Sequence, residues 1–174
     1  MTRRHPRAPD PSPLERQLEQ LHARSYGWAL SCCGWDADEA ADVVQAAYLK
    51  ILDGRARFEG RSELSTWLFG VIRVTASEHR RVRLRRRLLL ARHAPEQTVT
   101  RDDAVAGFHD ARMLHDALDA LPRRQREVLH LVFYGELTIR EAAEVMGVGI
   151  GTARVHYERG KKRLRASLTE QEEG

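Results

Sequence analysis

Apolar residues recur at helical spacing through the first half of the chain. A first helix is predicted from residue 14 to about residue 33 by the stripe Leu14, Leu18 and Leu21. After a break at Gly34, Asp36 or Asp38 can cap a second helix, because a short carboxylate accepts the free amides of a first turn. The second helix ends at Gly54, and its apolar stripe consists of Val44, Tyr48 and Ile51. Residues 58–65 are typical of a turn. A third helix is then predicted from about 65 to 87, with one face formed by Leu68, Ile72, Thr75 and Ala76.

Periodicity is lost between residues 89 and 109, where Pro95 and Gly107 lie among mixed charges, and this segment is predicted to be a flexible linker. Helical patterning resumes over about 110–120 and 122–134, with Pro122 at a first-turn position where its missing N–H does no harm. Gly135 ends the second of these helices. The chain is therefore predicted to be all-α, with two small helical domains joined by the linker. The predicted segments are a disordered tail at 1–13, a first domain at 14–88, the linker at 89–109, a second domain at 110–168 and an acidic tail at 169–174.

A helix-turn-helix is predicted over residues 138–157. Thr138 and Glu141 have the spacing of a capping box, and Gly147 permits a left-handed turn after the short first helix. The second helix starts near Gly149 or Ile150, and its inward stripe is Ala153, Tyr157, Gly160 and Leu164. The residues left on the outward face are polar or cationic for the most part: Thr152, Arg154, Val155, His156, Glu158, Arg159, Lys162 and Arg163. Such a face is what enters a DNA major groove, although an ordinary helical hairpin with solvated charges is the alternative.

Charge is distributed unevenly, which favours a nucleic-acid partner. The net charge is only +4, but seven arginines crowd residues 80–92 and six cations crowd residues 154–165. Clustered cations attract a polyanion, because each phosphate contact releases condensed counterions. Either cluster alone could equally be a solvated helical face.

Other classes of protein receive little support from the sequence. No apolar run reaches the length of a membrane helix, and residues 1–13 lack the apolar stretch of a secretory signal, so a cytoplasmic protein is expected. Cys32 and Cys33 are adjacent and make a poor zinc site, so we expect free thiols, no metal and no cofactor. A nucleic-acid enzyme would need clustered carboxylates, and Asp102 and Asp103 fall in the linker. We therefore expect no catalytic residues and no small-molecule substrate.

The segment from Leu114 to Leu168 resembles region 4 of the sigma-70 superfamily of RNA polymerase initiation factors. The matching features are Leu121-Pro122, Arg126, Leu129, Gly135, Glu141, Ala143, Gly147 and Gly151-Thr152. Residues 36–52 are similar to the polymerase-binding helix of region 2, and residues 58–81 to the segment that reads the −10 promoter element. With these two regions and a short linker, residues 14–168 resemble the compact extracytoplasmic-function (ECF) group. The resemblance implies a factor that directs promoter-specific initiation and is not an enzyme.

The resemblance also implies roles for individual residues. The polymerase-binding positions are Asp42, Val43, Val44, Gln45 and Leu49, with Asp42 and Gln45 facing the clamp helices of the large polymerase subunit. The positions for −10 DNA are Arg61, Ser62, Glu63, Trp67, Arg73, Val74, Ser77, Arg80 and Arg81. The positions for −35 DNA are Thr152, Arg154, Val155, His156, Arg159, Lys162 and Arg163. Trp67 fits either core packing or a base contact, and the loop 58–65 matches a segment that helps hold a flipped base.

The chain departs from the family pattern at four of these positions or their neighbours. Val74 stands where Asn is usual, and Ala46 replaces an acidic residue after the Asp-Val-Val-Gln motif. Gly149 replaces Ser or Pro at the start of the recognition helix, and His156 replaces a common Arg. Because histidine is mostly uncharged at neutral pH, the −35 specificity is expected to differ from that of relatives.

The partners implied by the resemblance are core RNA polymerase, promoter DNA and an anti-sigma factor. In relatives the anti-sigma factor is often anchored in the membrane, which would hold this chain at the inner membrane. A LuxR-type activator shares the helix-turn-helix, but it would need an upstream α/β receiver domain, whereas residues 14–87 have helical periodicity. Run-off transcription with core polymerase separates these classes, because only an initiation factor confers new promoter specificity.

Overall fold

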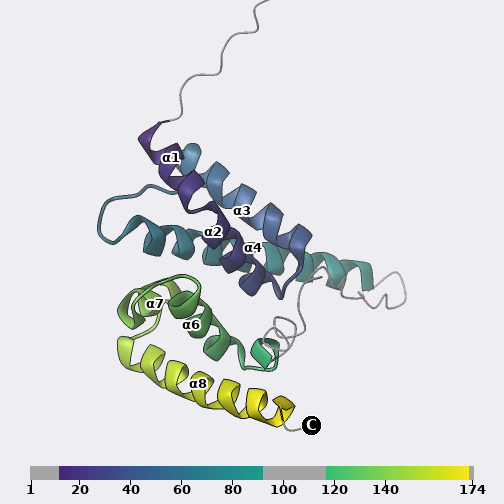
Figure 1. Ribbon diagram of the computed structural model, residues 1–174. Helices are drawn as coiled ribbons and strands as arrows, with labels where there is room; N and C mark the ends of the chain where they lie inside the picture. The colour runs from purple at the N-terminus through teal and green to yellow at the C-terminus, as the bar shows by residue number, and fades with distance from the viewer. Residues whose placement is uncertain (1–11, 92–116, 173–174) are drawn as a thin grey trace, which may run out of the picture.

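The computed structural model describes residues 12–91 and 117–172, and every regular element in these two ranges is a helix (Figure 1). The helices are α1 (Pro13–Gln20), α2 (His22–Cys33), α3 (Ala37–Leu52), α4 (Leu64–Ala91), α6 (Arg123–Phe133), α7 (Ile139–Met146) and α8 (Ile150–Glu172). Residues 117–119 are also helical. The all-α prediction is confirmed. The predicted tail over 1–11, most of the predicted linker and the helix predicted over 110–116 lie outside the described residues.

Three boundaries differ from those expected from the sequence. The first predicted helix is two helices that meet at Leu21, next to a contact in which the Tyr48 hydroxyl donates to the Leu18 carbonyl at 3.4 Å. Helix α4 continues through the predicted start of the linker to Ala91, because no Gly or Pro follows Gly70 until Pro95. Helix α8 runs into the predicted acidic tail, whose Glu and Gln are good helix formers.

The helix ends follow the local sequence signals. Asp36, not Asp38, caps α3 by accepting the Glu39 amide at 2.9 Å. Thr138 and Glu141 form the predicted capping box of α7. The break predicted at Gly34 and the left-handed turn predicted at Gly147 are both present, and both glycines have left-handed φ values, 66° and 64°. A residue with a side chain would be strained at either glycine, so these two positions set the exit directions of α2 and α7.

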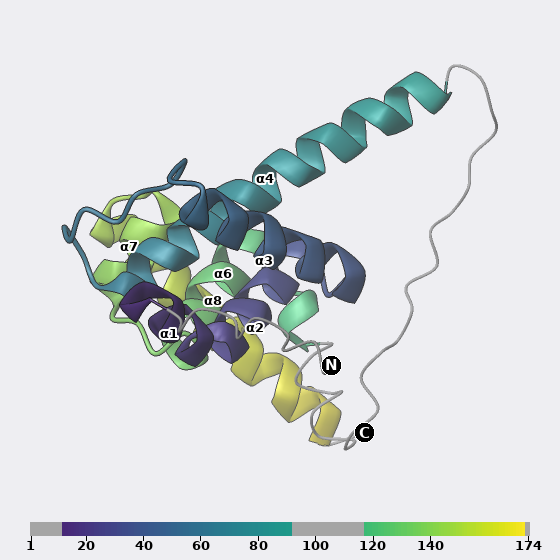
Figure 2. The same ribbon diagram turned by 90° about the horizontal axis from the view of Figure 1, so that it is seen from above.

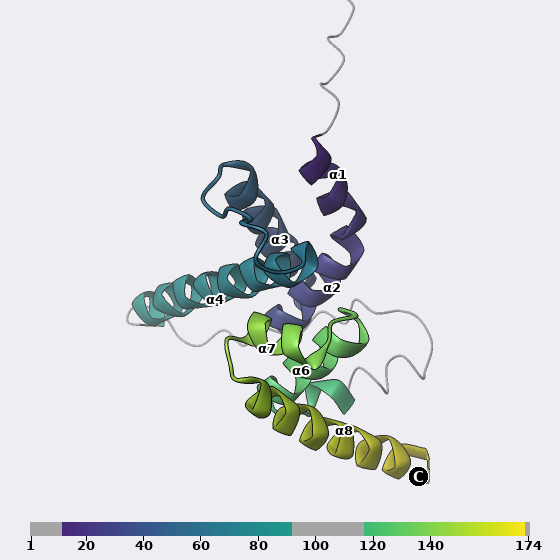
Figure 3. The same cartoon turned by 90° about the vertical axis from the view of Figure 1, so that its left-hand side faces the viewer.

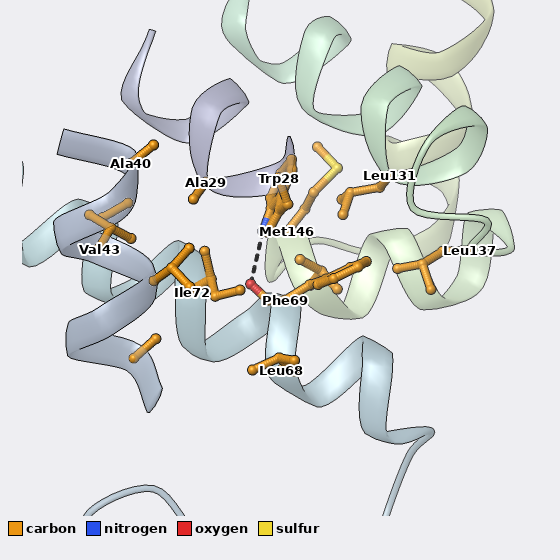
Figure 4. Close-up of a cluster of buried hydrophobic side chains, with 14 of the residues drawn as sticks. Trp28, Ala29, Ala40, Val43, Leu68, Phe69, Ile72, Leu131, Leu137 and Met146 are labelled. Atoms are coloured by element: carbon orange, nitrogen blue, oxygen red, sulfur yellow. Dashed lines mark hydrogen bonds between the residues drawn. The ribbon is translucent and has the colours of Figure 1, made fainter. Parts of the chain in front are cut away.

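One hydrophobic core extends through both halves of the chain. Trp28 of α2 is fully buried at its centre, and its indole N–H donates to the Phe69 carbonyl of α4 at 3.0 Å (Figure 4). The same cluster contains Leu131 of α6 and Met146 of α7. A smaller cluster, formed by Leu118, Leu121 and Leu129 with partly buried Tyr157 and Leu164, joins α8 to α6. The two predicted domains are therefore packed directly against each other.

The helices form layers, with α7 between α4 and α8 (Figures 1 and 3). Helices α1 to α4 form one group and α6 to α8 the other, and the two groups meet where α6 lies along α2 and α7 along α4. The last turns of α4 project beyond this body (Figure 2). Among the described residues, no helix is both long enough and apolar enough to cross a membrane.

Candidate polymerase- and DNA-binding surfaces

An exposed stripe on α3 contains three of the five polymerase-binding candidates. Asp42, Gln45 and Leu49 are exposed, and Leu52 continues the same helical face with 55% of its surface exposed. A carboxylate and an amide thus lie beside two leucines that are each about half exposed. The α3 stripe, defined by these four residues, is suited to a partner that is polar at one end and apolar at the other.

Val43 and Val44 do not belong to this exposed surface. Their side chains are 0% and 3% exposed, because α3 packs against both α2 and α4. As arranged here, these two residues cannot touch a partner, and they support the α3 stripe from beneath. Their burial indicates a structural role, and direct polymerase binding by these two residues stays an untested prediction.

A pocket of about 650 Å³ lies beside α4 and contains four of the −10 candidates: Ser62, Trp67, Arg73 and Val74. The rest of its lining comes from the end of α3, the following loop, α4 itself and the end of α7: Lys50, Arg55, Ala56, Thr66, Gly70, Val71, Thr75, Glu78, Glu144, Val145 and Gly147. The Thr66 hydroxyl is buried and has no hydrogen-bond partner among the described residues. Lys50 donates to the Thr75 hydroxyl at 3.0 Å and pairs with Glu78, so the pocket has a cation at one end.

Aromatic rings flank this pocket. Trp67 is half-buried, and its ring lies 5.3 Å from that of Phe58 at an angle of 50°. Both predicted roles of Trp67 therefore remain compatible with its position, since one part packs on the loop while another lines the pocket. Arg61 and Glu63, from the same loop, are exposed, and Arg61 pairs with Glu59.

Further along α4, the remaining −10 candidates share the pocket's side of the helix. Ser77, Arg80 and Arg81 follow Arg73 at spacings of four, seven and eight residues, which places them on one face. The Arg80 guanidinium donates to the Ser77 hydroxyl at 3.3 Å, and Arg81 is exposed. Burial, and then nearby Arg123 of α6, lowers the pKa of Arg80. Arg73 is only 18% exposed, and its Nε lies 3.7 Å from the Glu127 carboxylate of α6.

Helix α8 packs against α6 at a point that leaves little room for a side chain. A Cβ at Gly160 would lie 3.1 Å from Leu129 Cδ1 and 3.2 Å from Gln125 Cβ. With Gly160 and Ala153 buried, six of the seven −35 candidates are exposed: Thr152, Arg154, Val155, Arg159, Lys162 and Arg163. His156 is half-buried. Among the described residues, none of the four cations in this set forms an ion pair, so their charges are available to a polyanion.

Comparison with known proteins identifies the family of this chain. Family models for sigma-70 region 2 and sigma-70 region 4 match residues 18–86 and 111–164. The ECF RNA polymerase sigma factor EcfG of Rhodopseudomonas palustris is 31% identical over 81% of this chain and 77% of its own. SigC, an ECF sigma factor of Mycobacterium tuberculosis, is 32% identical over 75% of this chain and 71% of its own. The chain belongs to the ECF group of RNA polymerase sigma factors. It is an initiation factor that binds core polymerase and promoter DNA, and not an enzyme.

Two solved structures have a similar fold. The sigma factor RpoE of Bartonella quintana, solved in complex with the anti-sigma factor NepR, is 26% identical with a TM-score of 0.73. That match covers 90% of this chain and 96% of RpoE. CnrH, solved with the cytosolic domain of CnrY, is 21% identical with a TM-score of 0.60, covering 88% and 86%. The region 2 match thus runs from the end of α1 through most of α4, and the region 4 match includes α6, α7 and the first part of α8.

The sequence alone did not reveal several residues that line or support the candidate sites of this ECF sigma factor. Leu52 follows Gln45 by seven residues, so helical spacing could have added it to the α3 stripe. Lys50 and Thr66 reach the pocket only because the end of α3 lies beside α4, which no local signal reveals. The sequence suggests that Glu127 is a solvated charge on a helix. Its side chain is only 2% exposed, however, and its carboxylate forms ion pairs with Arg123 at 2.8 Å and Arg124 at 3.1 Å.

The two cysteines are free thiols at the end of α2. Burial, followed by the charge of Glu127, raises the pKa of Cys32, and burial also raises the pKa of Cys33 to about 12. Both thiols are thus protonated and weakly nucleophilic at neutral pH. Within residues 12–91 and 117–172, no group of three or more His, Cys, Asp or Glu side chains could hold a metal ion.

Proposed function

We propose that this sigma factor uses three separate surfaces: the α3 stripe for core polymerase, the α4 pocket for the −10 element and the outer face of α8 for the −35 element. The observation that carries the proposal is the arrangement of the candidates. Exposed polar and apolar residues lie together on α3, Trp67 lines one pocket beside α4 together with cationic residues, and the four cationic candidates on α8 form no ion pair among the described residues. Each surface therefore carries side chains that suit the partner assigned to it.

Polymerase binding is assigned to Asp42 and Gln45, with Leu49 and Leu52 adding apolar area. A charge-assisted hydrogen bond from Asp42 to a basic or amide group of the polymerase clamp helices would fix the orientation of α3. Ala46, which replaces an acidic residue of the family, is half-buried and adds no charge to this stripe.

Reading of the −10 element is assigned to the pocket and to the cations beyond it. Extruding one base costs a few kcal/mol of stacking, and stacking on an aromatic ring such as Trp67 or Phe58 returns about 1–3 kcal/mol per base. Ser62 offers a hydroxyl group to a base edge, whereas the Thr66 hydroxyl beside it is buried and has no hydrogen-bond partner among the described residues. Arg73, Arg80 and Arg81 would follow the phosphates along α4. Val74 is 54% exposed and offers only apolar contact where relatives have Asn.

Reading of the −35 element is assigned to α8. Thr152, Arg154 and Val155 lie in its first turns, which reach base edges most easily when a recognition helix enters the major groove. Arg159, Lys162 and Arg163 lie one to three turns further along, where phosphates are the nearer partners. His156 is half-buried and adds less charge than the arginine of relatives.

An anti-sigma factor is proposed to control the protein. The support is the membership of the ECF group, in which such inhibitors are common, and the likeness to RpoE, a sigma factor solved in complex with an anti-sigma factor. A membrane-anchored inhibitor would keep the chain at the inner face of the membrane until a signal releases it, and the free chain would act in the cytoplasm. Affinity purification of the tagged chain from membrane and cytosolic fractions, before and after stress, tests this part of the proposal.

Run-off transcription tests the proposal as a whole. Purified core polymerase with the chain is expected to initiate at a small set of promoters in a genomic library, and core polymerase alone is not. Trp67→Ala should reduce initiation at these promoters with little effect on core binding, and Arg154→Ala should alter the preferred −35 sequence. Wild-type transcription by both variants would remove the assignments to α4 and α8.

A further inference from the structure

The end of α4 combines strong positive charge with exposed aliphatic side chains. We define the α4 tip as residues 81–89, and all nine are either arginine or a large aliphatic residue: Arg81, Val82, Arg83, Leu84, Arg85, Arg86, Arg87, Leu88 and Leu89. Every one of them is exposed. The α4 tip also projects beyond the rest of the helical body, which leaves it open to an extended surface (Figure 2).

The aliphatic side chains of the α4 tip present apolar area on two sides of the helix. Leu84 and Leu88 are 57% and 61% exposed and lie four residues apart, so they share one side. Val82 and Leu89 are 47% and 64% exposed and lie seven residues apart on another side. A partner that surrounds the end of the helix can therefore bury all four side chains.

The arginines of the α4 tip do little to stabilise the helix itself. Arg83 ties the start of the tip to α3, through an ion pair with Glu39 and a contact of 3.5 Å with Asp36. The other four arginines of the tip form no ion pair among the described residues. Arg81 and Arg85 lie four residues apart, and like charges at this spacing destabilise a helix. The charge therefore indicates a polyanionic partner.

The side chains of the α4 tip favour an anionic membrane surface over a nucleic acid. Segments that bind nucleic acids combine cations with aromatic rings that stack on bases, or with amides and hydroxyls that read base edges. The α4 tip contains none of these groups. Leucine gains little beside phosphate, but it gains at the boundary of the acyl chains, from which long arginine side chains reach the headgroups.

The length of the α4 tip fits a segment that lies in the membrane interface. Nine helical residues measure about 13 Å, which is enough to enter the headgroup and acyl boundary to a depth of about 5–10 Å. The same segment is far too short to cross a hydrocarbon core of about 30 Å. Contact with lipid is thus limited to the surface of the bilayer.

We propose that the α4 tip docks this sigma factor directly on an anionic phospholipid membrane. Leu84 and Leu88 enter the boundary between headgroups and acyl chains, while Arg85, Arg86 and Arg87 bind the headgroup phosphates. The chain thereby has a reversible membrane attachment of its own, which needs no anti-sigma factor. This inference goes beyond the proposed function and uses neither the α4 pocket nor Arg73, so failure of the −10 assignment would leave it intact.

Flotation of the purified full chain with phospholipid vesicles measures this attachment. Phosphatidylcholine vesicles are compared with vesicles in which about 30% of the lipid is phosphatidylglycerol. The wild type should bind the anionic vesicles at least tenfold more tightly, because each arginine near an anionic surface contributes about a fivefold gain in affinity. Raising the salt concentration from about 0.1 M to about 0.5 M should weaken binding, since salt screens charges at a surface.

A leucine variant tests insertion into the bilayer. Replacing Leu84 and Leu88 together by glutamine keeps good helix formers at both positions, so the circular dichroism spectrum should not change. This double variant should lose at least tenfold in affinity for anionic vesicles, because it removes the apolar area that enters the interface. The matched control replaces Leu49 and Leu52 of α3, which are 49% and 55% exposed, and its vesicle binding should equal that of the wild type.

An arginine variant tests the location of the charge. Replacing Arg85, Arg86 and Arg87 by glutamine should also weaken binding to anionic vesicles at least tenfold. The matched control removes three exposed cations of α8 in the same way, through Arg159→Gln, Lys162→Gln and Arg163→Gln. Because these cations lie on another helix, without the leucines of the tip, the control should lose less than threefold.

Four results overturn the proposal. They are equal affinity for neutral and anionic vesicles, no detectable binding to either, full binding by the leucine variant, and an equal loss in the α8 control, which would indicate nonspecific adsorption of a basic protein. The same variants are also tested on a generic DNA duplex and on single-stranded RNA. Loss of nucleic-acid binding in the leucine variant, with vesicle binding unchanged, would assign the α4 tip to a nucleic acid instead.

Discussion

The His130 side chain should make the folded state acid-sensitive. It is 6% exposed, stacks on Tyr134 at 5.2 Å and lies 5.6 Å from the Trp28 ring, between α6 and α2. Burial lowers its pKa from 6.5 to about 4. Between these values the unfolded chain binds a proton that the folded chain excludes, so stability rises with pH. The contribution is complete above pH 6.5 and is lost as the pH falls towards 4. The stability lost relative to neutral pH is about 2 kcal/mol at pH 5 and about 3 kcal/mol near pH 4, at 1.36 kcal/mol per unit.

Urea unfolding at pH 7.5 and pH 5.0 measures this effect. His130→Phe keeps a buried ring of similar size but has no proton to gain, while the other histidines and the carboxylates contribute equally to both proteins. The wild type should therefore lose about 2 kcal/mol more than His130→Phe between the two pH values. Equal losses would show that His130 is hydrated or protonated in the folded state, and the burial argument would be refuted.

Three further predictions concern the proposed surfaces. Asp42→Arg should leave the circular dichroism spectrum unchanged and weaken binding to core polymerase at least tenfold, about 1.4 kcal/mol; wild-type affinity in a pull-down would contradict the assignment. Gly160→Leu should destabilise the fold by about 1–3 kcal/mol through overpacking against Leu129, whereas Gly151→Leu, in open space, should change stability by less than about 0.5 kcal/mol. In polymerase complexes, Arg154→Ala should cost about 1–3 kcal/mol and blur one or two −35 positions, whereas Lys162→Ala should weaken all sequences equally and lower the salt slope by about one. Equal losses on cognate and scrambled −35 DNA would make Arg154 a phosphate contact.

Local features of the fold could be predicted because their causes are local. The capping box of α7 needs only Thr138 and Glu141 three residues apart, and the turn that follows needs only the freedom of Gly147. The inward stripe of α8 follows from helical spacing, and the structure buries Ala153 and Gly160 as predicted. These signals define the helix-turn-helix and its outward cations.

The face of α3 was predicted less well, and its sequence explains why. Val44, Tyr48 and Ile51 suggested one narrow stripe, but α3 is covered on two sides, by α2 and by α4. Ala40 and Ala47 are buried together with Val43 and Val44, and this wider apolar face is weakly marked because alanine is common on any helix. Which residues of α3 are buried therefore depends on the neighbouring helices. Their packing buries Val43 and Val44 and leaves Asp42 and Gln45 exposed.

The core shared by the two regions could not be predicted from periodicity, because an apolar stripe on a helix can pack either inside its own domain or against another domain. Region 4 has only a small core of its own around Leu129. Its buried Leu131 and Met146 belong instead to the cluster that contains Trp28 and Phe69 of region 2. Separating the domains exposes these surfaces to water at a cost of about 25 cal/mol for each Å². A partner that covers either surface recovers this cost, whereas DNA contacts along α8 recover none of it. Because the α8 cations are already exposed while the two regions are packed together, binding of DNA to α8 provides no free energy for separating them.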